Sequence, residues 1–306
     1  MVRKAFLYLL ALLVMVPAMS SCIRDEIQKC PPLRITLKVK DKNYFNVDAV
    51  VNKGLIDRKD ENLPFREYIS TLFYIVRDEA GNIIEKRDLA NVAGDEKEMV
   101  IQLPVELPYG KYSITVWGNI KSRAPLDENF SGADLEHADA AKQDVYMASA
   151  VILYEMGSEN HIVELERAKG LLIVQAENLP DFIDSSEKTV SNVYRYVAEG
   201  FKYDRLTDIY SRTEWNEKNN IVTYSFTGPS KGFESSSLKL QFLNSDCNAG
   251  LGGDNICSLK PESIGITMIR NSITVVKYVY ADNNKFDIYV LVNDNWEEVH
   301  GLIIEE

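Results

Sequence analysis

Short runs in which apolar and polar residues alternate dominate this chain. The clearest covers residues 33–40, where every second side chain is apolar without a break. This spacing predicts a β-strand with one buried face. Residues 68–76 carry apolar side chains on both parities and end at the turn-rich segment 78–82. That pattern predicts a central strand of a hairpin, with a short buried helix as the alternative.

Further strands are expected along the whole chain, because β-branched and aromatic residues dominate the apolar runs. The expected strands are residues 99–103, 111–118, 145–155, 162–165, 171–176, 221–226, 238–243, 264–269, 273–280 and 286–292. Residues 121–143 are rich in Asp, Ala, Asn and Gly and predict a long loop. The last apolar run, 302–304, fits either an edge strand or a tail. Short strands separated by turns predict an all-β fold class built from sandwiches.

Two domains are predicted from a polar break at residues 157–160 and from chain length. After removal of a leader, about 285 residues remain, which favours roughly two domains. We therefore expect an N-terminal β-sandwich at 33–160 and a C-terminal β-sandwich at 161–306. Residues 22–32 form a polar tether that ends in Pro31-Pro32, which stiffens the approach to the first sandwich.

The N-terminus has the three parts of a secretory signal. Arg3 and Lys4 are followed by apolar residues 5–16 and by a small-residue segment that leads into Cys22. The apolar run would span only about 18 Å as a helix, against a hydrocarbon core of about 30 Å. We predict a signal peptide at 1–21 and lipidation of Cys22, whose acyl chains attach the protein to a membrane. The alternative is an ordinary secretory signal followed by an incidental cysteine.

Charge excludes one class of partner. The formal net charge of the chain is −12, and loss of Arg3 and Lys4 with residues 1–21, which hold no acidic residue, moves it to −14. Nucleic-acid binding needs clustered Lys and Arg to neutralise phosphates, and the sequence holds no such cluster. We therefore expect no nucleic-acid partner.

Three cysteines remain besides Cys22. Cys247 and Cys257 flank a Gly-rich segment, so a disulfide that closes this loop is the favoured interpretation over two reduced thiols. Cys30 is then left over, either free or in competition for one of the two partners. Spacing alone does not decide the connectivity.

The sequence offers little catalytic chemistry. His137, His161 and His300 stand alone, and none of the common zinc, phosphate-binding or serine-nucleophile motifs occurs. A superficial calcium-loop pattern from Asp246 fails, because Leu251 stands where the loop needs glycine and Cys257 where it needs glutamate. The 16 tyrosines are more typical of half-buried sheet faces than of a sugar platform. We expect no catalytic residue, no metal and no cofactor, and hence no enzyme.

Two segments carry a resemblance to a known family. One is Cys22-Ile23-Arg24-Asp25-Glu26 followed by Cys30-Pro31, and the other is residues 107–119, a proline–glycine turn and a strand that ends in Trp117-Gly118-Asn119. Together they resemble the FimB-like fimbrial anchor lipoproteins of the type V, protease-assembled fimbriae. Taken physically, the second segment places Tyr112, Ile114 and Val116 on one face of a strand and Trp117 on the other, as sandwich core.

The resemblance implies more than the residues themselves do. It implies two tandem transthyretin-like β-sandwiches and a non-enzymatic role at the membrane-held base of a fimbria. Fimbrial subunits would be the partners, with strand complementation as a candidate route of contact. Arg24, Asp25 and Glu26 resemble the signal that sends some lipoproteins to the cell surface, which implies an outer-membrane protein that faces the exterior. A surface lipoprotein that captures glycans is the alternative function.

Overall fold

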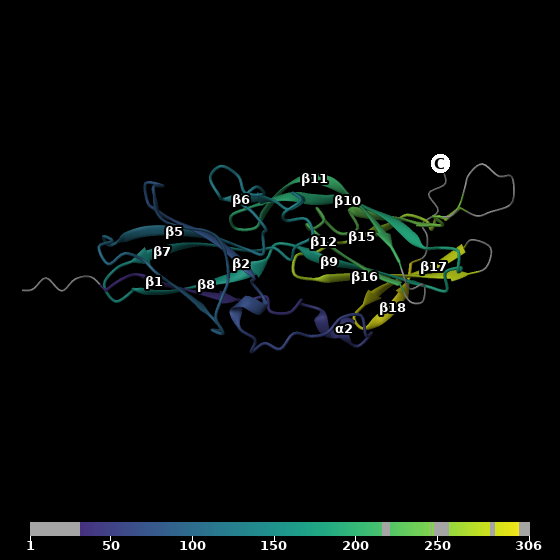
Figure 1. Cartoon of the computed structure of the whole chain (residues 1–306), viewed down its shortest axis with the longest axis horizontal. Coiled ribbons are helices and arrows are strands. Elements are labelled where there is room, and N and C mark those ends of the chain that lie inside the picture. The colour runs from purple at the N-terminus through teal and green to yellow at the C-terminus, as the bar shows by residue number, and fades with distance from the viewer. Residues whose placement is uncertain (1–30, 216–220, 246, 248–256, 282–284, 300–306) are drawn as a thin grey trace, which may run out of the picture.

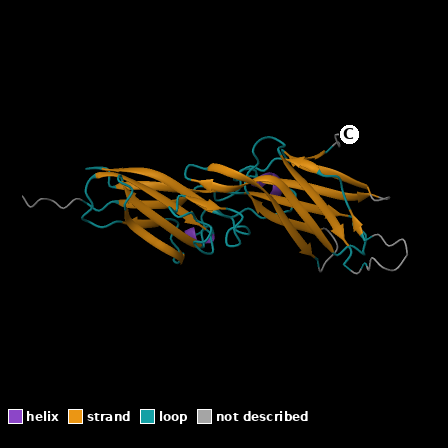
Figure 2. Ribbon diagram, turned by 90° about the horizontal axis from the view of Figure 1, so that it is seen from above, coloured by secondary structure: helices purple, strands orange, loops and turns teal. Residues whose placement is uncertain are grey.

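The computed structural model describes residues 31–215, 221–245, 247, 257–281 and 285–299. These residues form two β-sandwiches that follow one another along the long axis of the molecule (Figures 1 and 2). The predicted all-β fold class is confirmed. Residue 31, the first described residue, lies at the free end of the first sandwich, and the second sandwich lies at the opposite end (Figure 1).

The strands and helices follow the chain in a simple order. The first half contains β1 (Arg34–Val39), α2 (Val47–Val51), the 3-10 turn η2 (Phe65–Glu67), β2 (Thr71–Asp78), β3 (Ile83–Asn91), β4 (Met99–Gln102), β5 (Gly110–Gly118), β6 (Gly132–Asp134), β7 (Tyr146–Tyr154) and β8 (Asn160–Arg167). The second half contains β9 (Gly170–Glu177), β10 (Ser185–Ala198), β11 (Lys202–Glu214), β12 (Ile221–Thr227), β13 (Ser236–Leu243), β14 (Ser258–Leu259), β15 (Ile264–Ile266), β16 (Ile273–Ala281), β17 (Lys285–Val292) and β18 (Asn295–Glu298).

The first sandwich is one sheet of seven strands in the order β3-β2-β5-β7-β8-β1-β4. β8 joins the two halves of the sheet, because its last two residues pair with β7 and its residues Asn160–Leu165 pair with the whole of β1. The sheet thus folds over on itself and encloses a core that includes Leu37 of β1 and Leu165 of β8. The alternation of β1 predicted this directly: its apolar residues are buried and its polar residues are not.

β5 separates its side chains between two cores. Tyr112, Ile114 and Val116 lie in the core of the first sandwich, as expected. Trp117 points to the opposite face and is buried as a core residue, as expected, although not in the core between the two halves of the first sandwich. It lies fully buried in a separate apolar cluster, and its indole N–H donates to the carbonyl of Phe130 at 3.1 Å. The ring packs there because the segment between β5 and β7 folds back over that face.

The second sandwich has a sheet of six strands, β11-β10-β13-β14 with β15 and β6 at its sides, and a sheet of five strands, β12-β9-β16-β17-β18. Their facing sides form its core, to which Leu240, Phe242 and Tyr278 contribute. The longest hairpin of the molecule, β10–β11, was not among the predicted strands.

Two segments of the first sandwich reach the second and hold it from both sides. The segment between β1 and β2 carries α2 and packs Val50 and Leu55 against Ile173 and Val275 on the outer face of the five-stranded sheet. The segment between β5 and β7, predicted as a loop, contributes β6, which pairs with β10 of the other sheet. We call these two segments the arms, residues 40–70 and 119–145.

The change from one sandwich to the other comes between β8 and β9. β8 belongs to the first sheet and β9 to the second. The predicted boundary between residues 160 and 161 therefore falls within a strand of the first sheet, because the polar break at 157–160 is the turn of the β7–β8 hairpin.

Candidate functional site

Several residues singled out in the sequence lie outside the described residues. These are the signal peptide, Cys22, the triad Arg24, Asp25 and Glu26, and also Cys30, His300 and the tail 302–306. Lipidation and surface export therefore stay predictions. In the described part of the chain, no helix has the length and apolar character needed to cross a membrane.

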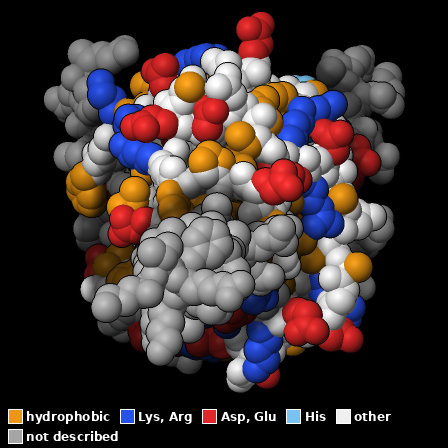
Figure 3. Space-filling view, turned by 90° about the vertical axis from the view of Figure 1, so that its left-hand side faces the viewer, with side chains coloured by type: hydrophobic (Ala, Val, Ile, Leu, Met, Phe, Trp, Pro, Cys, Tyr) orange, Lys and Arg blue, Asp and Glu red, His pale blue; other side chains and the backbone are white. Residues whose placement is uncertain are grey.

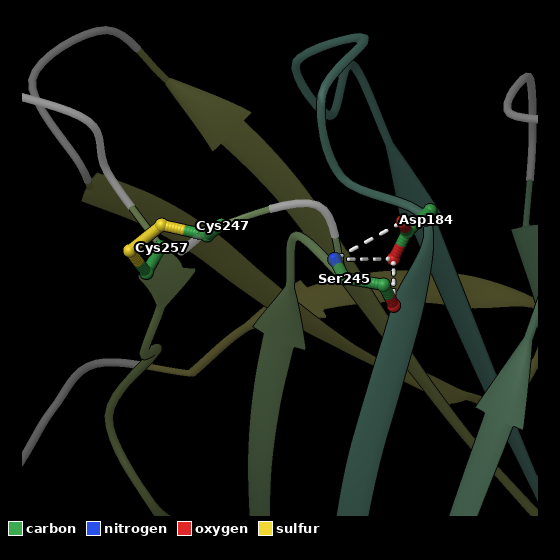
Figure 4. The surroundings of a disulfide bond; sticks show 4 residues. All are labelled: Asp184, Ser245, Cys247 and Cys257. Atoms are coloured by element: carbon green, nitrogen blue, oxygen red, sulfur yellow. Dashed lines mark hydrogen bonds between the residues drawn. A yellow bond between two sulfur atoms is a disulfide. The ribbon is translucent and has the colours of Figure 1, made fainter. Parts of the chain in front are cut away.

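The Cys247–Cys257 pair lies at the end of the second sandwich, beside β13 and β14. The structure joins the two residues by a disulfide, with their Cα atoms 5.3 Å apart (Figure 4). Close by, Asp184 accepts hydrogen bonds from the backbone N–H and the hydroxyl of Ser245, both from the segment that leads to Cys247. These bonds fix the base of the loop to the start of β10.

A ring nitrogen of each of the two described histidines has a hydrogen-bond partner close by in the chain. His137 Nδ1 accepts from the backbone N–H of Asp139 at 3.2 Å, and His161 Nε2 lies 3.0 Å from the carbonyl of Ser158. Among the described residues, no group of three or more His, Cys, Asp and Glu side chains is placed to hold a metal ion.

The strongest concentration of buried charge lies where the two sandwiches meet. We call it the joint, and it centres on the short connection from Arg167 to Gly170. The guanidinium of Arg167 is almost fully buried and donates to Asp144 Oδ2 at 2.9 Å and to Asn271 Oδ1 at 3.0 Å. It also lies over the ring of Tyr44, 4.1 Å from its centroid. Although burial opposes its charge, nearby Asp144 and the tyrosines raise the pKa of Arg167 overall.

Asp41 completes this part of the joint. Its carboxylate accepts from the backbone N–H of Arg167 at 2.8 Å and lies 3.8 Å from Arg270. Arg270 also forms an ion pair with Glu166 at 3.0 Å and lies over the ring of Phe201. Burial raises the pKa of Asp41, against the opposing effect of its hydrogen bond and its arginine neighbours. The start of the arm 40–70, β8 and the loop before β16 are thereby tied together.

Lys169 is the most deeply buried charge of the joint. Its ammonium group donates to the carbonyls of Leu135, Ala140 and Ala141, all from the arm 119–145, at 2.7–3.0 Å. Glu136 of the same arm lies 3.8 Å away. The ammonium thus holds the arm against the start of the second sandwich, since moving either part would leave a buried cation without its partners.

The joint was missed in the sequence, although a signal was present. Arg167-Ala168-Lys169 places two cations directly before the strongly apolar run 171–174. Such charges occur in this setting when they are paired. The partners of these two side chains come from residues up to 125 positions away along the chain, and they were not predictable.

A second feature with functional potential is the open edge of β11. This strand of 13 residues pairs with β10 on one side, and the sheet order places it at the outer edge among the described strands. It spans about 43 Å at 3.3 Å per residue. An edge strand presents backbone N–H and C=O groups that an added strand can pair with.

The side chains of β11 protect this edge from unspecific strand pairing but leave it accessible to a partner strand. From Leu206 to Glu214 every second residue is exposed, and these residues include Asp208 and Arg212 beside Leu206 and Tyr210. Charges on an edge discourage indiscriminate pairing. Arg205 adopts a positive φ of 59°, a local irregularity near the start of the strand.

The other described edges are shorter or partly covered. β4 has four residues, and β3 has nine with two register shifts against β2. β12 lies beneath the arm 40–70, where the hydroxyl of Tyr224 donates to the carbonyl of Leu55. β18 has four residues. β11 is therefore the longest open edge in the described part of the molecule.

Comparison with solved structures identifies proteins that share this fold. No family model matches the sequence, and no curated protein matches it. The chain is similar in structure to a candidate adhesin from Bacteroides ovatus, with 12% sequence identity and a TM-score of 0.58 over 92% of this chain and 98% of that one. It is also similar to candidate polysaccharide-binding proteins from Bacteroides thetaiotaomicron, with 12% identity and a TM-score of 0.53 over 88% and 98%.

A third solved structure is the fimbrial anchor protein Mfa2 from Porphyromonas gingivalis. Its TM-score is 0.49 at 12% identity, over 88% of this chain and all (100%) of that one. At these identities the first two similarities show a shared fold that extends over both sandwiches.

Proposed function

We propose that this protein is a non-enzymatic lipoprotein that anchors a fimbria to the outer membrane and receives an extended segment of a fimbrial subunit along β11. Acylated Cys22 would be the attachment to the membrane. The proposal places the chain in the FimB-like anchor family that its sequence resembles. The candidate adhesin with the same two-sandwich fold supports a role at the cell surface.

One observation carries the proposal: the long open edge belongs to the sandwich that lies away from the tether. The tether leads to β1 at the outer end of the first sandwich, whereas β11 runs along the second sandwich (Figure 1). A partner strand paired with β11 would therefore be held clear of the membrane by the first sandwich. Main-chain hydrogen bonds would supply affinity, and the exposed alternate side chains would supply selectivity.

The joint suits a protein that transmits force. A pulling load between lipid and fimbria passes from the first sandwich to the second, through β8, Arg167, Lys169 and β9. The two arms and the ion pairs Lys169–Glu136 and Arg270–Glu166 bridge the same connection in parallel. Opening the joint would expose paired charges and two apolar clusters together, which is costly.

Deletion of the gene tests the anchor directly. Cells that lack the protein should release intact fimbriae into the medium, and a copy with Cys22→Ala should fail to restore attachment. A copy with Cys30→Ala is the matched control, because it removes a neighbouring thiol but leaves the lipidation site. Fimbriae that stay attached to cells without the protein would contradict the proposal.

Glycan capture is a second candidate function. The observation in its favour is that candidate polysaccharide-binding proteins share the fold. A glycan array probed with purified residues 23–306 separates the two, because a glycan binder retains specific sugars without any fimbrial subunit. A reproducible glycan signal together with fimbriae that remain cell-bound after deletion would favour this second function.

A further inference from the structure

Exposed apolar side chains gather at the end of the first sandwich where the tether enters. Strand register defines this end: Arg34 of β1 pairs with Asn160 of β8 and with Gln102 of β4. Gly110 pairs with Tyr154, and Asp78 with Tyr112, which brings the β2–β3, β4–β5 and β7–β8 turns to the same end. The hydroxyl of Tyr154 donates to the carbonyl of Pro31 at 2.6 Å and fixes the incoming chain there.

Each of these three turns carries or directly precedes a large apolar residue in solvent. They are Ile83 at the start of β3, directly after the first turn, Val105 and Tyr109 in the second turn and Met156 in the third, with Leu153 beside them on β7. Met156 is 83% exposed at the tip of its hairpin. Figure 3 looks onto this end, where apolar side chains lie between charged ones. Isolated exposed apolar residues need no explanation, but several on one end face mark a contact surface.

The length of the tether limits what this surface can meet. Residues 22–30 are nine residues, which span at most about 30 Å when fully extended. If Cys22 is acylated, the end face therefore stays within that distance of the lipid surface. The turn tips are then the parts of the folded chain nearest to the bilayer.

Charge selects the kind of lipid contact. The same end carries Glu79, Glu106, Glu155 and Glu159 against Lys111 and Arg34. This acidic balance opposes electrostatic binding to anionic headgroups. The apolar tips instead fit the boundary between headgroups and acyl chains, where side chains such as Tyr and Met lose contact with water.

We propose that the tips of the β4–β5 and β7–β8 turns, with Val105, Tyr109 and Met156, insert into the headgroup–acyl boundary of the membrane that holds Cys22. The inference rests on the proposed lipid attachment and adds a second, non-covalent contact to it. That contact orients the first sandwich with its long axis away from the bilayer, because turns from both halves of the folded sheet touch the lipid together. The open edge of β11 is then held outward.

Tryptophan quenching in vesicles tests this contact. The full lipidated chain with Met156→Trp is reconstituted into phosphatidylcholine vesicles that contain lipids brominated near the upper ends of their acyl chains. The matched control is Phe233→Trp, because Phe233 is 84% exposed but lies in a loop of the second sandwich. Unsubstituted protein gives the background from the three native tryptophans.

We expect the brominated lipids to reduce the added fluorescence of Met156→Trp and to leave that of Phe233→Trp unchanged. Equal quenching at both positions, or none at Met156→Trp in protein that floats with the vesicles, would overturn the contact while leaving the anchor intact. Protein that does not float with the vesicles would overturn the lipid attachment as well.

Discussion

The ammonium group of Lys169 lies 3.8 Å from Glu136 Oε1; the lysine side chain is fully buried and the glutamate side chain is 12% exposed. Burial raises the pKa of Glu136 to about 7 and lowers the pKa of Lys169 to about 8. The folded-state pKa of Glu136 is above its ordinary value of 4.5. Its stabilising contribution is therefore complete below that value and is lost as the pH rises through about 7. The folded-state pKa of Lys169 is below its ordinary value of 10.5. Its stabilising contribution is therefore complete above pH 10.5 and is lost as the pH falls through about 8.

The first prediction is that the pair gives the free energy of unfolding a minimum between about pH 7 and 8. Glu136→Gln should remove the fall in the free energy of unfolding that the wild type shows between about pH 5 and 7, a change of about 1–3 kcal/mol. Lys169→Met should likewise remove the rise above about pH 8. Urea denaturation at about pH 5, 7.5 and 9.5 measures both sides. Identical pH profiles in wild type and Glu136→Gln would show that the carboxyl does not titrate in this range.

The second prediction concerns Lys188, a buried lysine on β10 whose ammonium donates to Thr223 Oγ1 at 3.2 Å. Burial lowers its pKa to about 8, so its charge destabilises the folded state below that pH and is relieved between 8 and 10.5. Lys188→Met should raise the free energy of unfolding near neutral pH by roughly 1–3 kcal/mol. The gain should shrink at about pH 10, because the wild-type lysine is then neutral when folded. A gain that is the same at both pH values would contradict this origin.

The sequence predicted those elements whose burial follows a local pattern. β1 alternates without a break, and the apolar faces of β5 and β13 repeat at every second residue. The β10–β11 hairpin was missed because its apolar residues are few. Val190, Val193 and Val197 are buried, but a register shift between the first two breaks the alternation. Its turn at Glu199-Gly200, where Gly200 has a φ of 71°, was the remaining local signal.

The joint and the arms could not be predicted, for a different physical reason. β6 is three residues long and exists because β10 lies beside it. Lys169 finds its carbonyl partners on a segment about 30 residues earlier in the chain. Trp117 alternates correctly, yet the core that it enters depends on how the arm 119–145 folds back. Local spacing determines which face a side chain takes, but not what covers that face.

The third prediction is that Cys247 and Cys257 are joined in the mature protein and that the bond contributes about 2–3 kcal/mol through the short loop it closes. Cys247→Ser with Cys257→Ser should lower the free energy of unfolding by that amount. Peptide mapping without reduction should recover the linked pair. A bond from Cys30 to either residue would refute this connectivity.

The fourth prediction concerns the open edge of β11. Tyr210→Lys or Leu206→Lys should weaken attachment of the fimbrial subunit and increase the fimbriae shed into the medium, since a charge replaces an apolar contact beside the added strand. Stability should change by less than about 0.5 kcal/mol, because both side chains are exposed. Ile269→Lys is the matched control, as Ile269 is 54% exposed against 46% for Leu206 but lies outside β11. If the control and the β11 variants shed equal amounts of fimbriae, the edge of β11 is not the acceptor of the fimbrial subunit.

The last prediction is that Asp25 and Glu26 direct the protein to the outer face of the outer membrane. An anchor has to meet fimbrial subunits outside the cell, so the signal that resembles a surface-export sequence should decide whether the body is displayed. Protease added to intact cells should cut the exposed segment around Arg58 and Lys59 in the wild-type protein. Asp25→Ala with Glu26→Ala should leave much of the protein uncut inside, whereas Gln28→Ala in the same tether should not. Full protection of the wild-type chain in cells with intact outer membranes would contradict both the surface location and the anchor, because no fimbrial subunit outside the cell would reach β11.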